Sequence, residues 1–402
     1  METGNGTGQS GGERAYDVVL FGATGFVGEL TAEYLAEHAP AGCRWALAGR
    51  NRAKLTALRE RLAARWPRCG DVPLVVADSA DADAMRELAA STRVVVTTVG
   101  PYVWFGEPLV AACAETGTDY VDLTGEPEFV DEMYVRHDAR ARETGARIVH
   151  ACGFDSVPHD LGVYYTVQQL PKDVPLRIDG FVRVGAAPSG GTFASALTAM
   201  GRGRETMRAA RERRLYEPRL VGRRARAPIG GPRFSRETGT WALPLPTIDA
   251  QVVARSARAL DAYGPDFVYR HYASVKTLPM ALGGATLVGG GLLAAQLAPV
   301  RSWLMSRYEA GTGPSAERRA RSWFTVRFVG EGGGRRVFTE VSGGDPGYGE
   351  TAKILAESAL CLALDEGLPK TSGQVTTAVA MGDALLGRLR AAGIRFRVAD
   401  AR

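Results

Sequence analysis

The chain has 402 residues, of which 45% are hydrophobic and 23% charged, and its formal net charge is +5. This composition excludes a mostly disordered chain, a fibrous protein and a polytopic membrane protein, and the length suffices for two or three domains. Only five of the 49 basic residues are lysines. Because charge reports on solubility and non-specific contacts, the arginine excess by itself predicts no nucleic-acid partner.

Residues 1–15 are rich in glycine, serine and threonine and contain no apolar run. They predict a disordered lead rather than a signal peptide. The chain also has five cysteines: Cys43, Cys69, Cys113, Cys152 and Cys361. Since they form no close pair and no CxxC motif, they predict neither a disulfide framework nor a zinc site, and we expect no metal. A reducing cytoplasm fits this cysteine usage.

An apolar run at residues 17–21 predicts a buried parallel strand, which leads directly into GATGFVG at 22–28. A helical pattern follows over residues 26–38. Strand, glycine turn and helix in this order are typical of a dinucleotide site, where a pyrophosphate meets the free N–H groups at the start of the helix. The cofactor contacts predicted from this segment are Gly22, Thr24, Gly25, Phe26, Val27 and Gly28.

The end of the next strand, residues 45–48, predicts which dinucleotide binds. An NAD site commonly has Asp or Glu here, which binds the 2′-hydroxyl of the ribose. In this chain Arg50 stands at that position and Arg52 follows. A guanidinium suits a 2′-phosphate, so we predict NADP(H); the alternative is that Arg50 is simply one of many arginines.

Strands and helices continue to alternate as far as residue 150. The strands are predicted at 72–77, 93–98, 120–123 and 147–150, and the helices at 81–90, 108–116 and 129–144. This alternation predicts an α/β fold, a Rossmann-type doubly wound parallel sheet in residues 16–162, with ligands at the carboxyl ends of its strands. Asp78, Gly100 and Pro101 follow such strand ends and complete the predicted cofactor contacts.

The sequence at these strand ends resembles the saccharopine dehydrogenase-like oxidoreductases. The matching motifs are GATGFVG (22–28), AGR (48–50), VGPY (99–102), YVDLTGE (120–126) and CGFDSVPHDLG (152–162). Within that family the chain is similar to the actinobacterial branch that includes the trans-acting enoyl reductases. Later matches lie at 189–195, 313–324, 342–353 and 380–394. The stretch 371–382 departs from the family pattern, in a late loop that the resemblance places near the substrate.

Residues 163–348 predict a second, α+β domain for the substrate or for dimerisation. Its strands are predicted at 177–184, 248–254, 267–275, 323–329 and 336–340, followed by a glycine-rich turn at 341–348. A helix is predicted at 350–364, and the resemblance implies that the helices of 349–402 return to the nucleotide-binding domain. Whether the protein forms a homodimer stays open.

Two segments of this second half suggest contacts with other molecules. A helix predicted from residue 189 to about 215 leads into 202–236, which holds twelve arginines and is either a docking surface for an acyl carrier or anionic lipid, or a solvated loop. The segment 277–300 has no charge, but its five glycines and two prolines make a poor membrane-spanning helix. Its alternatives are a buried element and one that contacts lipid. The lipid alternative predicts a cytoplasmic protein held peripherally at the inner face of the cell membrane.

The resemblance implies an NADPH-dependent reductase that acts on the enoyl group of an acyl or polyketide lipid, either free or carrier-bound. Hydride then adds to the β-carbon, the enolate oxygen needs a hydrogen-bond donor, and a proton must reach the α-carbon. The catalytic candidates near the strand ends are Tyr102, Asp155, Ser156 and His159. The alternatives are a redox-silent NADP-binding protein at a lipid surface or on a synthase, and a saccharopine-type amino-acid dehydrogenase.

A YxxxK pattern, Tyr272 with Lys276, is the signature of a different reductase class, in which both residues lie on a helix. Here the surrounding residues 267–275 alternate like a strand, which would separate the two side chains by about 13 Å along one face. The pattern therefore does not predict that chemistry.

Overall fold

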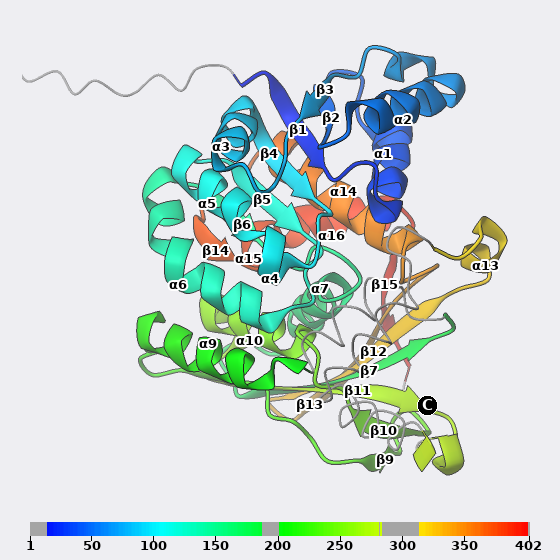
Figure 1. Cartoon of the computed structure of the whole chain (residues 1–402). Helices are drawn as coiled ribbons and strands as arrows, with labels where there is room; N and C mark the ends of the chain where they lie inside the picture. The colour runs from blue at the N-terminus through cyan, green and yellow to red at the C-terminus, as the bar shows by residue number, and fades with distance from the viewer. Residues whose placement is uncertain (1–13, 187–200, 281, 284–312, 401–402) are drawn as a thin grey trace, which may run out of the picture.

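The computed structural model describes residues 14–186, 201–280, 282–283 and 313–400. Most of the expected lead at 1–15, the motif at 189–195 with the start of its predicted helix, and most of the apolar segment 277–300 lie outside these residues. Two β-sheets organise the described chain, and Figure 1 shows helices packed around and between them.

The first sheet has seven parallel strands in the order β14-β6-β5-β4-β1-β2-β3. The strands are β1 (Tyr16–Phe21), β2 (Trp45–Gly49), β3 (Leu74–Val76), β4 (Thr92–Thr97), β5 (Asp119–Asp122), β6 (Arg147–Val149) and β14 (Gly373–Val375). This is the doubly wound order expected from the sequence, with β14 added at one edge. The order in which strands join the sheet reverses between β1 and β4, so a ligand is expected beyond the carboxyl ends of these two strands.

Helices cover both faces of this sheet. They are α1 (Phe26–His38), α2 (Arg52–Arg65), α3 (Ala82–Ser91), α4 (Tyr102–Phe105), α5 (Glu107–Thr116), α6 (Pro127–Thr144) and α14 (Gly349–Leu364). Val18 and Leu20 of β1 pack in one apolar cluster with α1 and α14, whereas Val19 and Phe21 pack in another with α3, α5 and α6. Because successive strand residues face opposite ways, both sides must be apolar, which explains the unbroken hydrophobic runs in the sequence.

The second sheet is mixed, in the order β15-β13-β12-β7-β11-β10-β9, and β8 also pairs with β11. Its strands are β7 (Leu176–Val184), β8 (Arg224–Arg226), β9 (Arg233–Ser235), β10 (Thr240–Pro244), β11 (Asp266–Val275), β12 (Phe324–Gly332), β13 (Arg335–Gly343) and β15 (Arg395–Ala399). The remaining α-helices of the described residues are α7 (Val157–Val167), α9 (Gly203–Tyr216), α10 (Asp249–Ala259), α13 (Ala316–Ala320), α15 (Thr377–Ala380) and α16 (Gly382–Ala391).

The strand predicted at 248–254 is wrong, because this segment forms the helix α10. Ile248, Val252 and the alanines of this segment suggest the alternating apolar pattern of a strand, but the burial pattern is that of a helix. The buried residues of the segment are Asp249, Val252, Val253, Ser256 and Ala257, which follow the spacing of one face of a helix. The strand predicted around Tyr272 is confirmed as β11, so the YxxxK pattern lies on a strand.

The last residues of the chain contribute to both sheets. Helix α14 packs against α1 and the first sheet, and β14 joins that sheet beside β6. Strand β15 instead pairs with β13 at the edge of the second sheet. Helices α7 and α10 contact each other and strands of the second sheet, and both lie between the two sheets in Figure 1. The carboxyl ends of the parallel strands therefore face the second half of the chain.

Candidate active site

The glycine turn after β1 has the geometry that a pyrophosphate requires. Gly22 has a φ of +84°, which L side chains rarely adopt, and a Cβ on Gly28 would lie 2.2 Å from the carbonyl oxygen of Gly22. Gly25 precedes α1 and is exposed, and no side chain caps the helix there. Because first-turn N–H groups have no acceptor within the helix, this end of α1 offers donors to an anion.

The side chain of Phe26 contacts the second half of the chain. Its ring packs edge-on against Tyr348, with centroids 4.8 Å apart, and the Arg319 guanidinium lies 5.5 Å from its centroid. Thr24 and Val27 are half-buried beside it. The backbone of this segment, rather than its side chains, is therefore available to contact a cofactor.

Arg50 directly follows β2 and is exposed, as is Arg52 at the start of α2. Within the part of the chain that the structure describes, neither guanidinium has a hydrogen bond or an ion pair. Asp78 lies beyond β3, and its carboxylate accepts a hydrogen bond from the N–H of Ala80, 3.0 Å away. The ends of β2 and β3 lie side by side, so two unpaired cations stand where a 2′-phosphate is expected.

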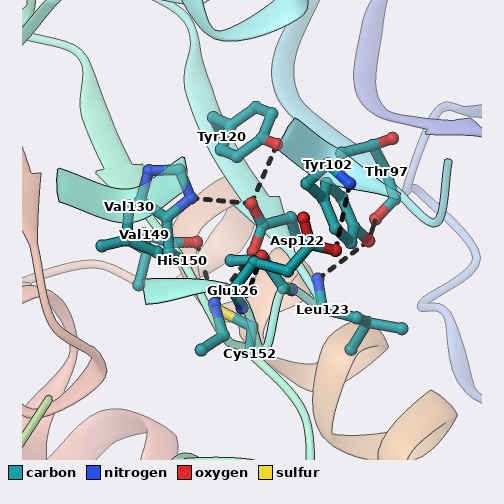
Figure 2. Close-up of polar contacts among 12 residues, drawn as sticks. Thr97, Tyr102, Tyr120, Asp122, Leu123, Glu126, Val130, Val149, His150 and Cys152 are labelled. Carbon is teal, nitrogen blue, oxygen red and sulfur yellow. Dashed lines mark hydrogen bonds and ion pairs between the residues drawn. The ribbon is translucent and has the colours of Figure 1, made fainter. Parts of the chain in front are cut away.

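Asp122 holds the ends of β5 and β6 together, as Figure 2 shows. Its buried carboxylate accepts hydrogen bonds from the Tyr120 hydroxyl (2.9 Å) and from Nδ1 of His150 (2.7 Å). It also accepts from the N–H groups of Thr124 (3.0 Å) and Ala151 (2.9 Å). The loops that leave the two strands are thus fixed by one side chain of the YVDLTGE motif.

Tyr102, a catalytic candidate from the sequence, is buried and bonded to the backbone. Its hydroxyl donates to the carbonyl of Thr97 (3.1 Å) and accepts from the N–H of Leu123 (3.2 Å). The carboxylate of Glu126 accepts from the N–H groups of Tyr102 (3.2 Å) and Val103 (2.9 Å). Burial, with the nearby charge of Asp122, raises the pKa of Tyr102 well above its usual value. In this arrangement its hydroxyl proton is not available to a substrate.

The other three candidates lie together where β6 leads into α7. Ser156 has a φ of +102°, unusual for a residue with a side chain, and its buried Oγ has no partner among the described residues. The Asp155 carboxylate lies near Gly125, where a Cβ would be 3.7 Å from Oδ2. Burial, and then the charge of Asp249, raises the pKa of Asp155 to about 7. His159 is buried in the first turn of α7.

Two residues that the sequence did not suggest complete this group. Asp249 begins α10, and its carboxylate lies 3.3 Å from Nδ1 of His159 and 3.4 Å from Nε2 of His271 on β11. Burial lowers the pKa of His159 to about 4, although Asp249 opposes the shift. Burial would raise the pKa of Asp249, but the two histidines hold it well below its usual value. The mistaken strand at 248–254 concealed this arrangement.

Residues 18–149 match the family model described as the saccharopine dehydrogenase NADP binding domain. A Mycobacterium tuberculosis protein, named provisionally as a trans-acting enoyl reductase, is 40% identical and covers 96% of this chain and 97% of its own. The trans-acting enoyl reductase of Mycobacterium ulcerans is 36% identical, over 96% of this chain and 98% of its own length. The structure of saccharopine dehydrogenase (L-Glu forming) from Saccharomyces cerevisiae has a TM-score of 0.55 at 13% sequence identity. The match covers 95% of this chain and 99% of the yeast chain.

The fold and the glycine turn define an NADP-dependent oxidoreductase with a Rossmann-type domain. The chain belongs to the saccharopine dehydrogenase-like family, in the branch of the trans-acting enoyl reductases. NADP(H) is its cofactor, as the unpaired Arg50 and the uncapped start of α1 also indicate.

Proposed function

We propose that this protein uses NADPH to reduce the carbon–carbon double bond of an enoyl lipid or polyketide intermediate. The observation that carries the proposal is near-full-length similarity, at 36–40% identity, to trans-acting enoyl reductases. The half-buried carboxyl group of Asp155 and the unpaired hydroxyl of Ser156, just before α7, add a means of proton transfer beside the strand ends.

The chain's own residues have separate tasks in binding the cofactor. The uncapped start of α1, from Gly25, suits the pyrophosphate, and Arg50 and Arg52 suit the 2′-phosphate. Asp78 lies where the adenine is expected, and Gly100 and Pro101 lie where the nicotinamide is expected. When bound, the cofactor supplies the hydride.

We assign delivery of the proton to Asp155 and support of the enolate oxygen to the Ser156 hydroxyl. The Asp155 carboxylate lies close to Gly125, in the loop that follows β5. The Ser156 hydroxyl is buried and has no hydrogen-bond partner in the described chain, which leaves it free to donate to a substrate oxygen. Tyr102 keeps the neighbouring loops in place rather than donating a proton.

Apolar surface near this edge suits an acyl chain. Trp104 and Phe105 lie on α4, three and four residues after Pro101, and are 58% and 43% exposed. A cavity of about 220 Å³ also opens beside Ile248, the neighbour of Asp249 in the sequence. Its apolar lining includes Val130, Ile248, Val252, Val375 and Val379, and Arg142, Arg213, Arg255 and Arg258 also line it.

The exposed face of α9 suits a carrier that delivers the acyl group. Arg204, Arg211 and Arg214 have no ion pair within the described chain, and the exposed Met207 lies between them at helical spacing. Such a mixture of basic and apolar groups complements an acidic carrier protein. Other arginines of 202–236 pair within the molecule: Arg202, Arg208, Arg213, Arg223, Arg226 and Arg233.

Contact with a membrane surface is a secondary proposal. Leu278, Met280 and Leu282 begin the apolar segment and are 43%, 61% and 61% exposed. No helix within the described ranges is both long and apolar enough to cross a bilayer. We propose peripheral contact through this segment, to be tested by sedimentation with anionic vesicles.

The test of the proposed reaction is NADPH oxidation with a panel of enoyl thioesters, free and carrier-bound, using cofactor deuterated at the transferred position. We expect deuterium at the β-carbon of the product. Asp155→Asn should bind NADPH normally but lose most of the turnover, whereas Asp83→Asn, on the exposed surface of α3, should match the wild type. Tight NADPH binding without hydride transfer to any enoyl substrate would overturn the proposal in favour of a redox-silent protein.

A further inference from the structure

We propose that His159, Asp249 and His271 bind a divalent transition-metal ion, with Zn²⁺ as the ion that their chemistry fits best. The inference stands apart from the proposed function, because it rests on side chains from α7, α10 and β11 and is tested by metal content. No spacing motif could reveal it, since the three ligands lie in distant parts of the sequence.

The first observation is that this cluster is buried yet poorly hydrogen-bonded. His159, Asp249 and His271 are 1%, 3% and 5% exposed. Within the described residues, both ring nitrogens of His159, Oδ1 of Asp249 and Nε2 of His271 have no hydrogen-bond partner. Native proteins rarely leave buried polar atoms unpaired, so four in a single cluster indicate a missing partner.

The second observation is the distances between the donor atoms. Nδ1 of His159 lies 3.3 Å from Oδ1 of Asp249, and Nε2 of His271 lies 3.4 Å from Oδ2. The ligand atoms of all three residues lie within 4.8 Å of one another. Ligands about 2.0–2.1 Å from a tetrahedral zinc ion are roughly 3.3 Å apart, which agrees with the contact between Nδ1 of His159 and Oδ1 of Asp249. Nε2 of His271 contacts the other oxygen of the same carboxylate, so its distance places the ring beside Asp249 but is not a separation from Oδ1.

The third observation is that neighbouring groups already orient the ligands. The Tyr269 hydroxyl lies 2.8 Å from Nδ1 of His271, which leaves Nε2 of the same ring for a metal. The Thr247 hydroxyl donates to Oδ2 of Asp249. The Phe154 ring packs edge-on against His159, with centroids 5.5 Å apart. Hydrogen bonds behind the ligands and an apolar wall are typical of built metal sites.

The ligand types select the class of ion. Two imidazole nitrogens and one carboxylate suit Zn²⁺ and its neighbours in the transition series, whereas Mg²⁺ and Ca²⁺ prefer all-oxygen sites. Three protein ligands leave a coordination position for water or for an oxygen atom of a bound ligand, as is usual in catalytic rather than structural zinc sites.

The test begins with metal content of the full-length wild-type chain, freed of any affinity tag and purified without chelator. We expect about one zinc per chain by elemental analysis. Chelated protein should take up one Co²⁺ and develop the visible absorption of a tetrahedral site. His271→Gln and Asp249→Asn should lose most of the bound metal, whereas His38→Gln, on the exposed face of α1, should retain it.

The wild-type cobalt titration needs no variant, so a misfolded mutant cannot decide the outcome. A wild-type protein that carries no metal, and takes up neither Zn²⁺ nor Co²⁺ at micromolar concentration, would overturn the proposal and leave only the ion-pair contacts of Asp249 with the two histidines. Full metal content in both His271→Gln and Asp249→Asn would also overturn it, by placing the metal elsewhere. Neither result would bear on NADPH binding or enoyl reduction.

Discussion

At the scale of single residues, we propose that the choice of cofactor depends on the side chain of Arg50. It stands at the end of β2 without an ion pair in the described chain, so its charge is free for a ligand. A charge-assisted hydrogen bond contributes about 1.5–3 kcal/mol. Arg50→Ala should therefore weaken NADPH binding by roughly 10- to 100-fold while leaving NADH affinity almost unchanged.

Calorimetric titration with both nucleotides measures this effect. Arg140→Ala removes another exposed arginine, on α6, and should leave both dissociation constants unchanged. Equal affinities of the wild type for NADPH and NADH would contradict the role given to Arg50.

The position of Tyr102 in the sequence suggests a catalytic role, but its hydrogen bonds indicate a role in stabilising the fold. Because its hydroxyl joins Thr97 to Leu123, Tyr102→Phe should destabilise the fold by about 1–2 kcal/mol. The folded fraction should keep most of its turnover. Denaturant unfolding and kcat, measured on the same preparation, separate the two effects. A collapse of kcat with unchanged stability would restore Tyr102 as the proton donor.

At the scale of elements, the glycine turn and α1 depend on an approach that only glycine allows. A Cβ at position 28 would meet the backbone of Gly22 at 2.2 Å, and backbone cannot give way as a flexible side chain can. Gly28→Ala should therefore displace the turn, cost about 1–3 kcal/mol and abolish NADPH binding. Thermal unfolding with and without NADPH measures both consequences.

A matched control exists on α16, where a Cβ on the exposed Gly387 would meet nothing within 4 Å. Gly387→Ala should stabilise the protein by about 0.5–1 kcal/mol, since alanine favours a helix interior. If Gly28→Ala behaved like this control, the tight turn would not be needed for the cofactor.

The side chain of Glu340 links three strands of the second sheet through hydrogen bonds. Its ionisation makes the stability of the protein depend on pH. On β13, it accepts hydrogen bonds from Arg327 of β12 (2.8 Å) and Arg397 of β15 (3.0 Å). Burial would raise the pKa of Glu340, but the two guanidinium groups outweigh it and lower the pKa below its usual value. The stabilisation is therefore complete above the unfolded pKa of about 4.3 and is lost as pH falls through the lower, folded value.

Glu340→Gln should cost about 1–3 kcal/mol at pH 7, and this difference from the wild type should vanish in acid. Urea unfolding of both proteins at pH 7, 5 and 3 measures this difference in stability. Glu331→Gln breaks only an exposed pair with Arg336 and should cost about 0.5 kcal/mol or less. A penalty for Glu340→Gln that stayed constant between pH 7 and pH 3 would contradict this account.

At the scale of the whole molecule, the end of the chain closes the edge of the second sheet. Ile394 and Phe396 are buried in the apolar cluster that also reaches α14 and the first sheet. Deleting residues 394–402 should lower Tm by at least about 5 °C and promote aggregation, because β13 becomes an open edge. Deleting only 400–402 leaves β15 whole and should change little. Scanning calorimetry and light scattering compare the two forms.

Much of the first half of the molecule could be predicted from local patterns. The helix expected at 26–38 is α1, and the strands expected around the glycine turn, Arg50 and Gly100 are β1, β2 and β4. Gly22, Arg50 and Gly100 therefore lie at one edge of the sheet because a parallel sheet brings its strand ends together.

The second half was harder because its helices and strands pair over long distances. Alternation at 248–254 indicated a strand, yet the segment buries Asp249 and Ser256 on one face of a helix. Tertiary contacts override such short local signals. In the same way, the hydroxyl of Tyr102 could be identified as engaged only once Thr97 and Leu123 were seen beside it.

By itself the sequence determined the Rossmann-type sheet, the NADP preference and the family, because strand, turn and helix signals are local and the motifs stand at strand ends. Only the tertiary structure decided that His159, Asp249 and His271 meet in a buried cluster, and that Asp122 joins the ends of β5 and β6 while the Tyr102 hydroxyl is bonded to the backbone. The physical reason is that these residues lie far apart in the sequence. Their burial and the distances between their donor atoms depend on how the elements pack, which no single segment of sequence can predict.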